Sequence, residues 1–491
     1  MSCGCRNSTP PGPREVKPVP AKVAQVARPA PVIIYLIDTL RFDRVGAYGH
    51  AGGLTPHMDD LALESVLFEQ AYVTAPWTLP SVVSIYTSTF PTEHGVTHMK
   101  YKLDPATRPL GVLLAERGYV NNSFVANAKS KYAVGPAWGY QAFNICKQIF
   151  DFDAVGAWID QHRSGRMHLY LHTTEPHLPF VAPIEFVQRY APITEERRAA
   201  VNEAFQNYVD NRWHGGKDKE GKPRDWQKDY AEIELAAMNR LAALADDVRA
   251  LYDVHVAWSD ANLGRTIADL RQRGLWEDCL FVLLADHGEE LGDHGGWLHC
   301  VSVYEELIRV PFMIKFPRAE FGGTRVPEPI SLIDLAPTIL DYLGAPDDAA
   351  GFRGKSLLPR LKNPAASQAA PEPMALAIRN STPKDDHLHN KRRGLTNLAV
   401  REGTWKGVWN VELNTFELYD LSSDPGEQRN VSAEKPEVRD RLEKFARTWM
   451  RNEKKRAVAH VGGPLDAETL RNMKDLGYMG DEELDHEEPK R

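Results

Sequence analysis

Val32-Ile33-Ile34-Tyr35-Leu36-Ile37-Asp38 is the stretch from which the fold of this chain can be worked out. The run before the aspartate is uncharged and of strand length, which predicts a strand buried on both faces, as in a parallel sheet. Cys279-Leu280-Phe281-Val282-Leu283-Leu284-Ala285-Asp286 has the same form, an apolar run that ends in an aspartate. The two runs therefore predict two inner strands of one sheet.

The segments between these two runs alternate in type. Helical spacing or composition marks 113–117 and 252–273, and strand-like runs mark 123–126 and 167–172. This alternation predicts an α/β fold with a large, mostly parallel sheet flanked by helices. Ligands of such sheets bind beyond the carboxyl ends of the strands. Asp38 and Asp286 are therefore expected at one site.

The rest of the chain divides by composition. The polar stretch 183–250 is predicted to be a helical insertion in the catalytic domain, either a lid or a solvated surface excursion. After a Pro/Ala-rich stretch come short strand-like pieces and a segment of helical spacing, which predict a smaller C-terminal α+β subdomain with an antiparallel sheet. The predicted boundaries are a disordered leader or tether 1–30, a catalytic α/β domain 31–361, a linker 362–375, a small sheet plus helix 376–460 and a tail 461–491.

Bulk properties limit the partners and the location. The 491 residues carry a net charge of -8 without a dense Lys/Arg stripe, so nucleic acid is not an expected partner. No apolar run reaches the ~20 residues of a membrane span. Five cysteines do not imply a disulfide framework. Residues 1–30 are either a cytoplasmic leader or, if Met1-Ser2-Cys3 ends a truncated lipoprotein signal, a tether with a lipid anchor. We favour the periplasmic or extracytoplasmic location slightly over the cytoplasmic one.

Asp286-His287-Gly288 places a carboxylate and an imidazole side by side at a predicted strand end. A glycine after them allows the sharp turn that lets both reach one cation. Asp38 adds a second carboxylate, and the hydroxyl of Thr78 would complete the set. These ligands suit one divalent metal ion, with Mn²⁺ or Zn²⁺ favoured and Ca²⁺ or Mg²⁺ as the other candidates.

Ala75-Pro76-Trp77-Thr78-Leu79-Pro80-Ser81-Val82-Val83 places a threonine directly before an apolar helix. Thr78 is therefore either a helix N-cap or a nucleophile next to the amide dipoles that bind anions, and the two roles are compatible.

These stretches together resemble the sulfatase family of the alkaline-phosphatase superfamily, over roughly residues 31–480. In that family a Cys or Ser at the position of Thr78 is oxidised to formylglycine, whose hydrate attacks sulfate esters. A threonine cannot yield that aldehyde, so its hydroxyl resembles the nucleophile of the phosphodiesterase and phosphotransferase branches. The motifs that carry the resemblance are Ile37–Asp43, Thr55–Asp59, the Thr78 turn, Pro91–Val96, Glu175–Phe180, Asp286–Gly295, Tyr304–Pro311, Asp334–Thr338 and Leu418–Leu421 with Asp424-Pro425.

The resemblance also implies roles for two histidines. His177 should contact the anionic oxygens of the substrate or protonate the leaving group, and His299 lies where sulfatases carry a Lys or His with the same role. Each could instead be a structural surface histidine. His294 is expected to order its loop rather than to bind metal.

Departures from the family pattern concern positive charge. Thr39 replaces a second aspartate, Val82 replaces the arginine that steadies formylglycine, and 124–128 lacks the usual Lys-x-His pair. The candidate substrate-binding residues there are Lys100 and Asn127. Lys100 could replace some of the lost charge, or could be a solvated loop lysine.

The sequence therefore predicts a sulfatase-like, metal-dependent hydrolase or transferase of an anionic ester substrate. A phosphate ester, most of all a phosphodiester, is favoured, with Thr78 as nucleophile. The alternatives are a sulfuric ester hydrolase that acts without formylglycine, and an inactive family member that binds anionic glycans or lipids.

Overall fold

A computed structural model provides the structure of the protein. It describes residues 30–98, 101–126, 138, 140, 142–145, 149–213, 230–300, 302–363, 372–380, 396–456 and 461–462. Within these ranges, no helix combines the length and apolar character needed to cross a membrane.

The larger domain, predicted to be catalytic, is built on an eight-stranded sheet with the order β13-β2-β12-β8-β1-β7-β5-β6. All neighbouring pairs are parallel except those of β12, which runs antiparallel to β2 and to β8. The inner strands are completely buried. The strands of this sheet are β1 Val32–Ile37, β2 Val66–Phe68, β5 Val120–Val125, β6 Ala142–Ile145, β7 Met167–Thr173, β8 Leu280–Ala285, β12 Phe312–Lys315 and β13 Arg325–Val326.

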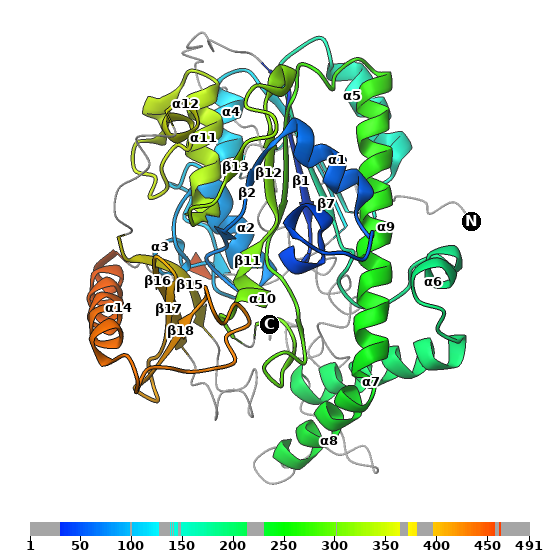
Figure 1. The fold of residues 1–491 in the computed structure, drawn as a ribbon. Helices are drawn as coiled ribbons and strands as arrows, with labels where there is room; N and C mark the ends of the chain where they lie inside the picture. Colours follow the sequence, from blue (N-terminus) through cyan, green and yellow to red (C-terminus); the bar gives the residue numbers. More distant parts are fainter. Residues whose placement is uncertain are drawn as a thin grey trace, which may run out of the picture.

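Helices cover both faces of this sheet, which Figure 1 shows nearly edge-on. On one side lie α2 Thr78–Thr87, α4 Leu110–Glu116, α11 Leu335–Tyr342 and α12 Leu358–Lys362; on the other lie α1 Pro56–Glu64, α5 Phe152–His162 and the long α9 Ala245–Gln272. The predicted α/β class with a mostly parallel sheet is confirmed, because apolar strands that are buried on both faces need helices on both sides.

The smaller C-terminal sheet is antiparallel, with the order β15-β16-β17-β18, and α14 covers it. Its bounds are β15 Met374–Asn380, β16 Thr396–Glu402, β17 Trp405–Asn410, β18 Thr415–Asp420 and α14 Pro436–Arg456. The expected linker 362–375 is shorter in the structure, since Lys362 ends α12 and Met374 already pairs with Arg401.

This subdomain is joined to the catalytic domain next to the Thr78 turn. The backbone N–H of Ile378 donates to the carbonyl of Thr74 at 2.9 Å. The next residue, Arg379, donates from Nε to the carbonyl of Cys300 at 2.6 Å, and the N–H of Cys300 donates to Pro76 at 3.0 Å. The first strand of the small sheet thus supports the segment that leads to Thr78.

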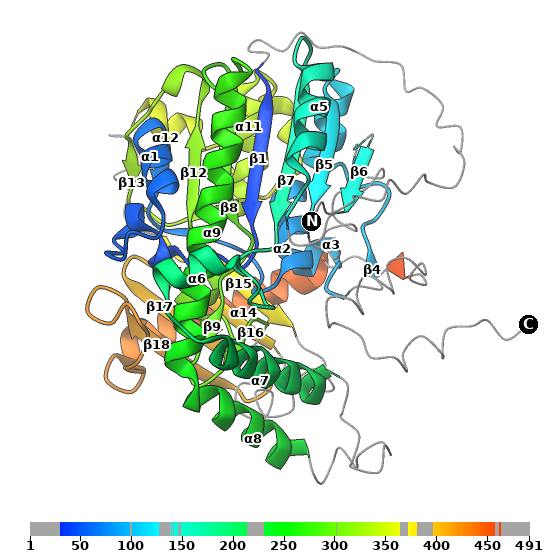
Figure 2. The same cartoon turned by 90° about the vertical axis from the view of Figure 1, so that its right-hand side faces the viewer.

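The predicted insertion 183–250 contains α6 Ile184–Tyr190, α7 Glu195–Trp213, α8 Tyr230–Ala243 and the start of α9. Figure 2 shows α7 and α8 beyond the lower end of the central sheet, beside α9. The short remaining elements are α3 Pro91–His94, α10 Glu305–Ile308, and the strands β3 Ala71–Tyr72, β4 Tyr101–Lys102, β9 Glu290–Leu291, β10 Trp297–Leu298, β11 Arg309–Val310, β14 Ile330–Ser331 and β19 Val461–Gly462. β19 pairs with β4, so the expected tail 461–491 begins with a bridge to the catalytic domain.

Candidate active site

Asp38 and Asp286 follow two neighbouring strands. β1 and β8 are parallel, and Ile37 pairs with Ala285, so both aspartates leave the sheet at the same edge. Both side chains are completely buried. The sheet register therefore brings together the two carboxylates that the sequence predicted as metal ligands.

Backbone turns fix the carboxylate of Asp286. Thr39 has a φ of 58°, and this sharp turn directs its N–H to Oδ1 of Asp286 at 3.3 Å. The N–H of His287 donates to the same oxygen at 3.0 Å. The other oxygen, Oδ2, has no hydrogen-bond partner among the described residues. One carboxylate oxygen is thus held by the backbone while the other remains for a ligand.

The Nε2 atom of His287 lies where the predicted ligands meet. It is 3.2 Å from Oγ1 of Thr78, 3.5 Å from Oδ1 of Asp38 and 3.6 Å from Oδ2 of Asp286. The Nδ1 atom lies 2.8 Å from the carbonyl oxygen of Gly288. Because a carbonyl only accepts, Nδ1 carries the proton, and the lone pair of Nε2 faces the other three groups.

Thr78 is the first residue of α2 rather than its N-cap. The N-cap is Trp77, without a side-chain capping bond, and the hydroxyl of Thr78 faces His287 instead. Ser81, one turn on, donates from Oγ to the carbonyl of Asp286 at 2.6 Å. The N-terminus of α2, whose amide dipoles favour an anion, is thereby held against the end of β8.

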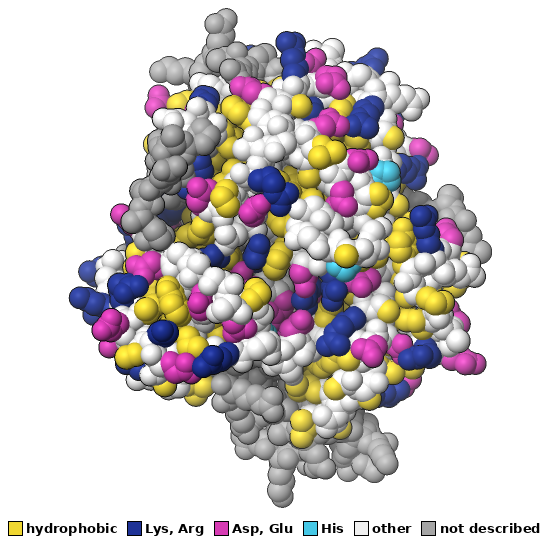
Figure 3. All heavy atoms as spheres, viewed as in Figure 1, with side chains coloured by type: hydrophobic (Ala, Val, Ile, Leu, Met, Phe, Trp, Pro, Cys, Tyr) yellow, Lys and Arg dark blue, Asp and Glu magenta, His cyan; other side chains and the backbone are white. Residues whose placement is uncertain are grey.

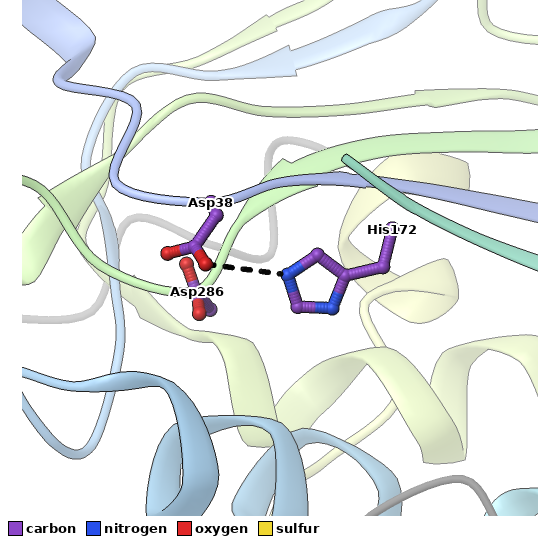
Figure 4. Close-up of side chains that lie close together, drawn as sticks. All are labelled: Asp38, His172 and Asp286. Carbon is purple, nitrogen blue, oxygen red and sulfur yellow. Dashed lines mark ion pairs between the residues drawn. The ribbon is translucent and has the colours of Figure 1, made fainter. Parts of the chain in front are cut away.

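His172 of β7 joins this group, although the sequence analysis did not select it. Its Nε2 lies 3.7 Å from Oδ2 of Asp38, and Figure 4 shows the ring pointing at that carboxylate. The hydroxyl oxygen of Tyr170 lies 2.9 Å from Nδ1 of His172. Ligand atoms of Asp38, His172 and Asp286 all lie within 4.8 Å of one another. The sheet-edge rule that selected Asp38 would also have found His172, one residue before the end of β7.

The charge state of the two aspartates fits a cation between them. Burial raises the pKa of Asp286 well above its usual value, and the charge of Asp38 raises it further. Burial also opposes ionisation of Asp38, but a hydrogen bond from His172 and the positive charge that His177 and His287 carry when protonated hold its pKa well below the usual range. With neutral His287, the two buried carboxylates and the lone pair of its Nε2 form a donor set for a divalent transition metal ion.

His177 and His299 lie beside this group. The ring centroid of His299 is 4.6 Å from that of His287 and 5.2 Å from that of His177. The Nδ1 atom of His177 faces the carbonyl of Leu178 at 2.6 Å, and that of His299 faces Oε1 of the buried Glu289 at 3.0 Å. In both rings Nδ1 is thus engaged by an oxygen of the protein itself. Glu289 is a second residue that the sequence analysis missed.

Comparison with known proteins identifies the family of this chain. Residues 31–345 match the sulfatase family, and residues 292–454 match the C-terminal region of N-sulphoglucosamine sulphohydrolase. The chain belongs to the sulfatase family. It is thereby placed in the alkaline-phosphatase superfamily, whose enzymes bind a divalent metal ion.

Individual relatives are distant. Arylsulfatase K of Danio rerio is 30% identical over 204 residues, which make up 41% of this chain but only 37% of that protein. An arylsulfatase of Clostridium perfringens is 21% identical over 457 residues, which make up 82% of this chain and 89% of that protein. The structure of a phosphonate monoester hydrolase from Silicibacter pomeroyi superposes with a TM-score of 0.64 at 21% identity, covering 88% of this chain and 96% of that one. This last likeness shows the fold alone.

Departures from the sulfatase-family pattern can be located only in part. Val82, at the position of the family arginine, is buried in α2, and Ala126 is buried just after β5. The predicted substrate-binding residues Lys100 and Asn127 lie outside the described residues. His294 is not part of the group around Asp38 and Asp286. Its Nδ1 lies 2.7 Å from Oε1 of Glu306, and with Glu290 these residues form a second group of possible metal ligands, so the loop-ordering role stays a prediction.

Proposed function

We propose that this sulfatase-family protein is a metal-dependent hydrolase or transferase of phosphate esters with Thr78 as its nucleophile. The observation that carries the proposal is the position of the Thr78 hydroxyl. It is buried at the N-terminus of α2 and lies 3.2 Å from Nε2 of His287, which is itself within 3.6 Å of both strand-end carboxylates. A hydroxyl so placed can act directly, without oxidation to an aldehyde.

The chain's own residues would divide the reaction as follows. Thr78 gives up its hydroxyl proton to solvent, and its Oγ1 forms a bond to phosphorus while the bond from phosphorus to the leaving oxygen breaks. This leaves a phosphothreonine, which keeps the second ester substituent when the substrate is a diester. His177 or His299 gives a proton from Nε2 to the leaving alkoxide. Water or an acceptor alcohol then cleaves the phosphothreonine and regenerates the hydroxyl.

A divalent ion held by Asp38, Asp286 and His287 would lower the pKa of the hydroxyl and offset charge on the transferred group. We favour Mn²⁺ or Zn²⁺ because the set includes imidazole nitrogen. A single such ion leaves room for a second ester substituent, which favours diesters over monoesters.

Threonine itself favours phosphate over sulfate. The hydrate of formylglycine has a second hydroxyl on the same carbon, which can expel the product, whereas Thr78 has one oxygen. With Thr78 as the nucleophile, phosphorus or sulfur must therefore be attacked twice, first by Thr78 and then by water or an acceptor alcohol. Each attack breaks a bond from that atom to an ester oxygen. The apolar Val82, at the position of the family arginine, and the absence of the Lys-x-His pair from 124–128 point the same way.

Hydrolysis of sulfate esters is the second candidate, because the sequence relatives named above are arylsulfatases. Initial rates of the protein loaded with Mn²⁺ or Zn²⁺ on aryl sulfate, aryl phosphate, aryl phosphodiester and aryl phosphonate esters separate the two. The expected order places the phosphodiester first.

The matched variants are Thr78→Val, which keeps the shape but removes the hydroxyl, and Thr78→Ser, which keeps the hydroxyl. Valine should lower kcat by about 10³-fold or more, and serine by far less. Mass spectrometry of quenched reactions should find the phosphoryl group on Thr78, with the second ester substituent still attached when the substrate is a diester. Faster turnover of sulfate would overturn the phosphate assignment, and bound metal without turnover of any ester would indicate the inactive anion-binding alternative.

A further inference from the structure

The helix α7 touches the segment that follows His177. The side chain of Asn202 brackets the backbone of Phe180: its Oδ1 accepts from the N–H of Phe180 at 3.0 Å, and its Nδ2 donates to the carbonyl of Phe180 at 3.0 Å. Both polar groups of one amide are thus used on one residue. Such a two-point contact fixes position and direction together.

The same helix also touches the segment that leads to His299. The ring of Phe205, which is 3% exposed, meets the ring of Phe180 edge-on at 5.9 Å and that of Trp297 edge-on at 6.2 Å. Trp297 lies two residues before His299. One side chain of α7 is therefore packed between the two segments that carry the candidate catalytic histidines.

A third contact holds the segment after His177, and it comes from a different helix, α9. Nε2 of His255, on α9, accepts from the N–H groups of Val181 and Ala182 at 2.8 and 2.9 Å. With Asn202 on α7, this fixes three consecutive backbone amides after Pro179. The insertion is therefore attached to the site by specific hydrogen bonds.

We propose that Asn202 and Phe205 are positioning residues, through which α7 sets where His177 and His299 lie relative to Thr78. On this view the insertion is a fixed wall of the active site and not a solvated excursion. The inference rests on the proposed function insofar as the two histidines act on the substrate. Misplacing a catalytic group by about 1 Å can cost on the order of 10²-fold in rate.

The first experiment compares Asn202→Ala, the isosteric Asn202→Asp and the control Asn207→Ala, whose side chain is exposed on the same helix. On the ester that the unaltered protein cleaves fastest, Asn202→Ala should lower kcat about 10- to 100-fold and change KM less than about threefold. The substitution Asn202→Asp would place an oxygen against the carbonyl of Phe180, so this variant should be equally slow. Normal kcat in Asn202→Ala, or recovery in Asn202→Asp, would overturn the proposal.

A second variant tests the aromatic contact. Phe205→Leu keeps an apolar side chain but withdraws the ring from Trp297, and it should lower kcat by a similar factor while the thermal unfolding midpoint stays close to that of Asn207→Ala. An unchanged kcat in Phe205→Leu would remove Phe205 from the proposal.

Failure of the proposed function is seen separately, as absence of Thr78-dependent turnover in the unaltered protein. In that case amide hydrogen exchange decides the structural claim. Asn202→Ala should speed exchange at Phe180 by about tenfold or more, because the N–H loses its acceptor, and should leave the amides of β1 and β8 unchanged. Exchange at Phe180 equal to that in Asn207→Ala would overturn it.

Discussion

The carboxylate of Glu289 lies against Nδ1 of His299. Replacing one oxygen of this carboxylate tests what the contact does. Glu289→Gln keeps the shape but removes the charge that favours a protonated ring. If His299 protonates the leaving oxygen, kcat should fall about 10- to 100-fold for alkyl esters. Aryl esters with good leaving groups need less proton donation and should be affected less.

The measurement is kcat against the pKa of the leaving alcohol for the unaltered protein and for Glu289→Gln. Glu277→Gln is the matched control, since Glu277 is exposed. An equal loss for every leaving group would mean that Glu289 only supports the fold.

The predicted metal ligands could be found from the sequence because they follow buried apolar strands. Strand pairing alone brings Asp38 and Asp286 to one edge, and His287 comes with Asp286. Glu289 could not be found this way, because its contact with His299 depends on how the chain returns through β9 and β10. Such a pairing is tertiary and leaves no periodic signal in sequence.

The loop after β8 is held by an ion pair that depends on pH. Nδ1 of His294 donates to Glu306 at 2.7 Å and Nε2 to the carbonyl of Glu427 at 3.2 Å, so both nitrogens carry protons. Burial alone would lower the pKa of His294, but Glu306, Glu290 and Glu427 raise it to about 9.

A raised folded-state pKa stabilises the protein below the unfolded-state pKa of ~6.5, and this stabilisation disappears as the pH rises through about 9. His294→Gln should therefore lower the free energy of unfolding by on the order of 2 kcal/mol at pH 6 and by little at pH 10. Urea unfolding at both values measures this difference. A loss that is the same at both would show that the charge of His294 does not contribute.

The helix α7 shows how far an element can be predicted. Its sequence is polar, and the segment 183–250 was expected to be a helical insertion. The buried Val201, Ala204, Phe205 and Tyr208 follow the i, i+3, i+4, i+7 spacing of a narrow apolar stripe. That stripe predicts that one face is covered. It does not say by what, because Phe180 and Trp297 come from segments distant in the chain.

The two domains share a buried charged contact. Nζ of Lys406, on β17, lies 3.0 Å from Glu305 and 2.9 Å from Glu427, and all three side chains are almost completely buried. Lys406→Met would leave two carboxylates without their cation, which should lower the free energy of unfolding by about 3–5 kcal/mol.

Lys444→Met, at an exposed site on α14, is the control for this change and should have little effect. Adding Glu305→Gln and Glu427→Gln to Lys406→Met should recover part of the loss, because the uncompensated charges are gone. If the triple variant is less stable than Lys406→Met, the carboxylates do not account for the effect.

The surface in Figure 3 has basic and acidic side chains interspersed over the face shown, as a net charge of -8 spread over 491 residues allows. What binds at the site is therefore decided by the side chains inside it and not by the charge of this face. The small sheet supports the site through the hydrogen bond of Ile378 to Thr74, and the insertion supports it through the hydrogen bond of Asn202 to Phe180.

The bond from Ile378 to Thr74 also sets an order of events during synthesis. A ribosome that adds ~5–20 residues per second needs some tens of seconds to travel from one to the other. During that interval the nascent chain already contains Asp38 and Thr78, and Asp286 is added before the interval ends. The backbone before Thr78 still lacks its hydrogen bond from Ile378. The hydroxyl of Thr78 is thus expected to reach its final placement only after Ile378 has been translated.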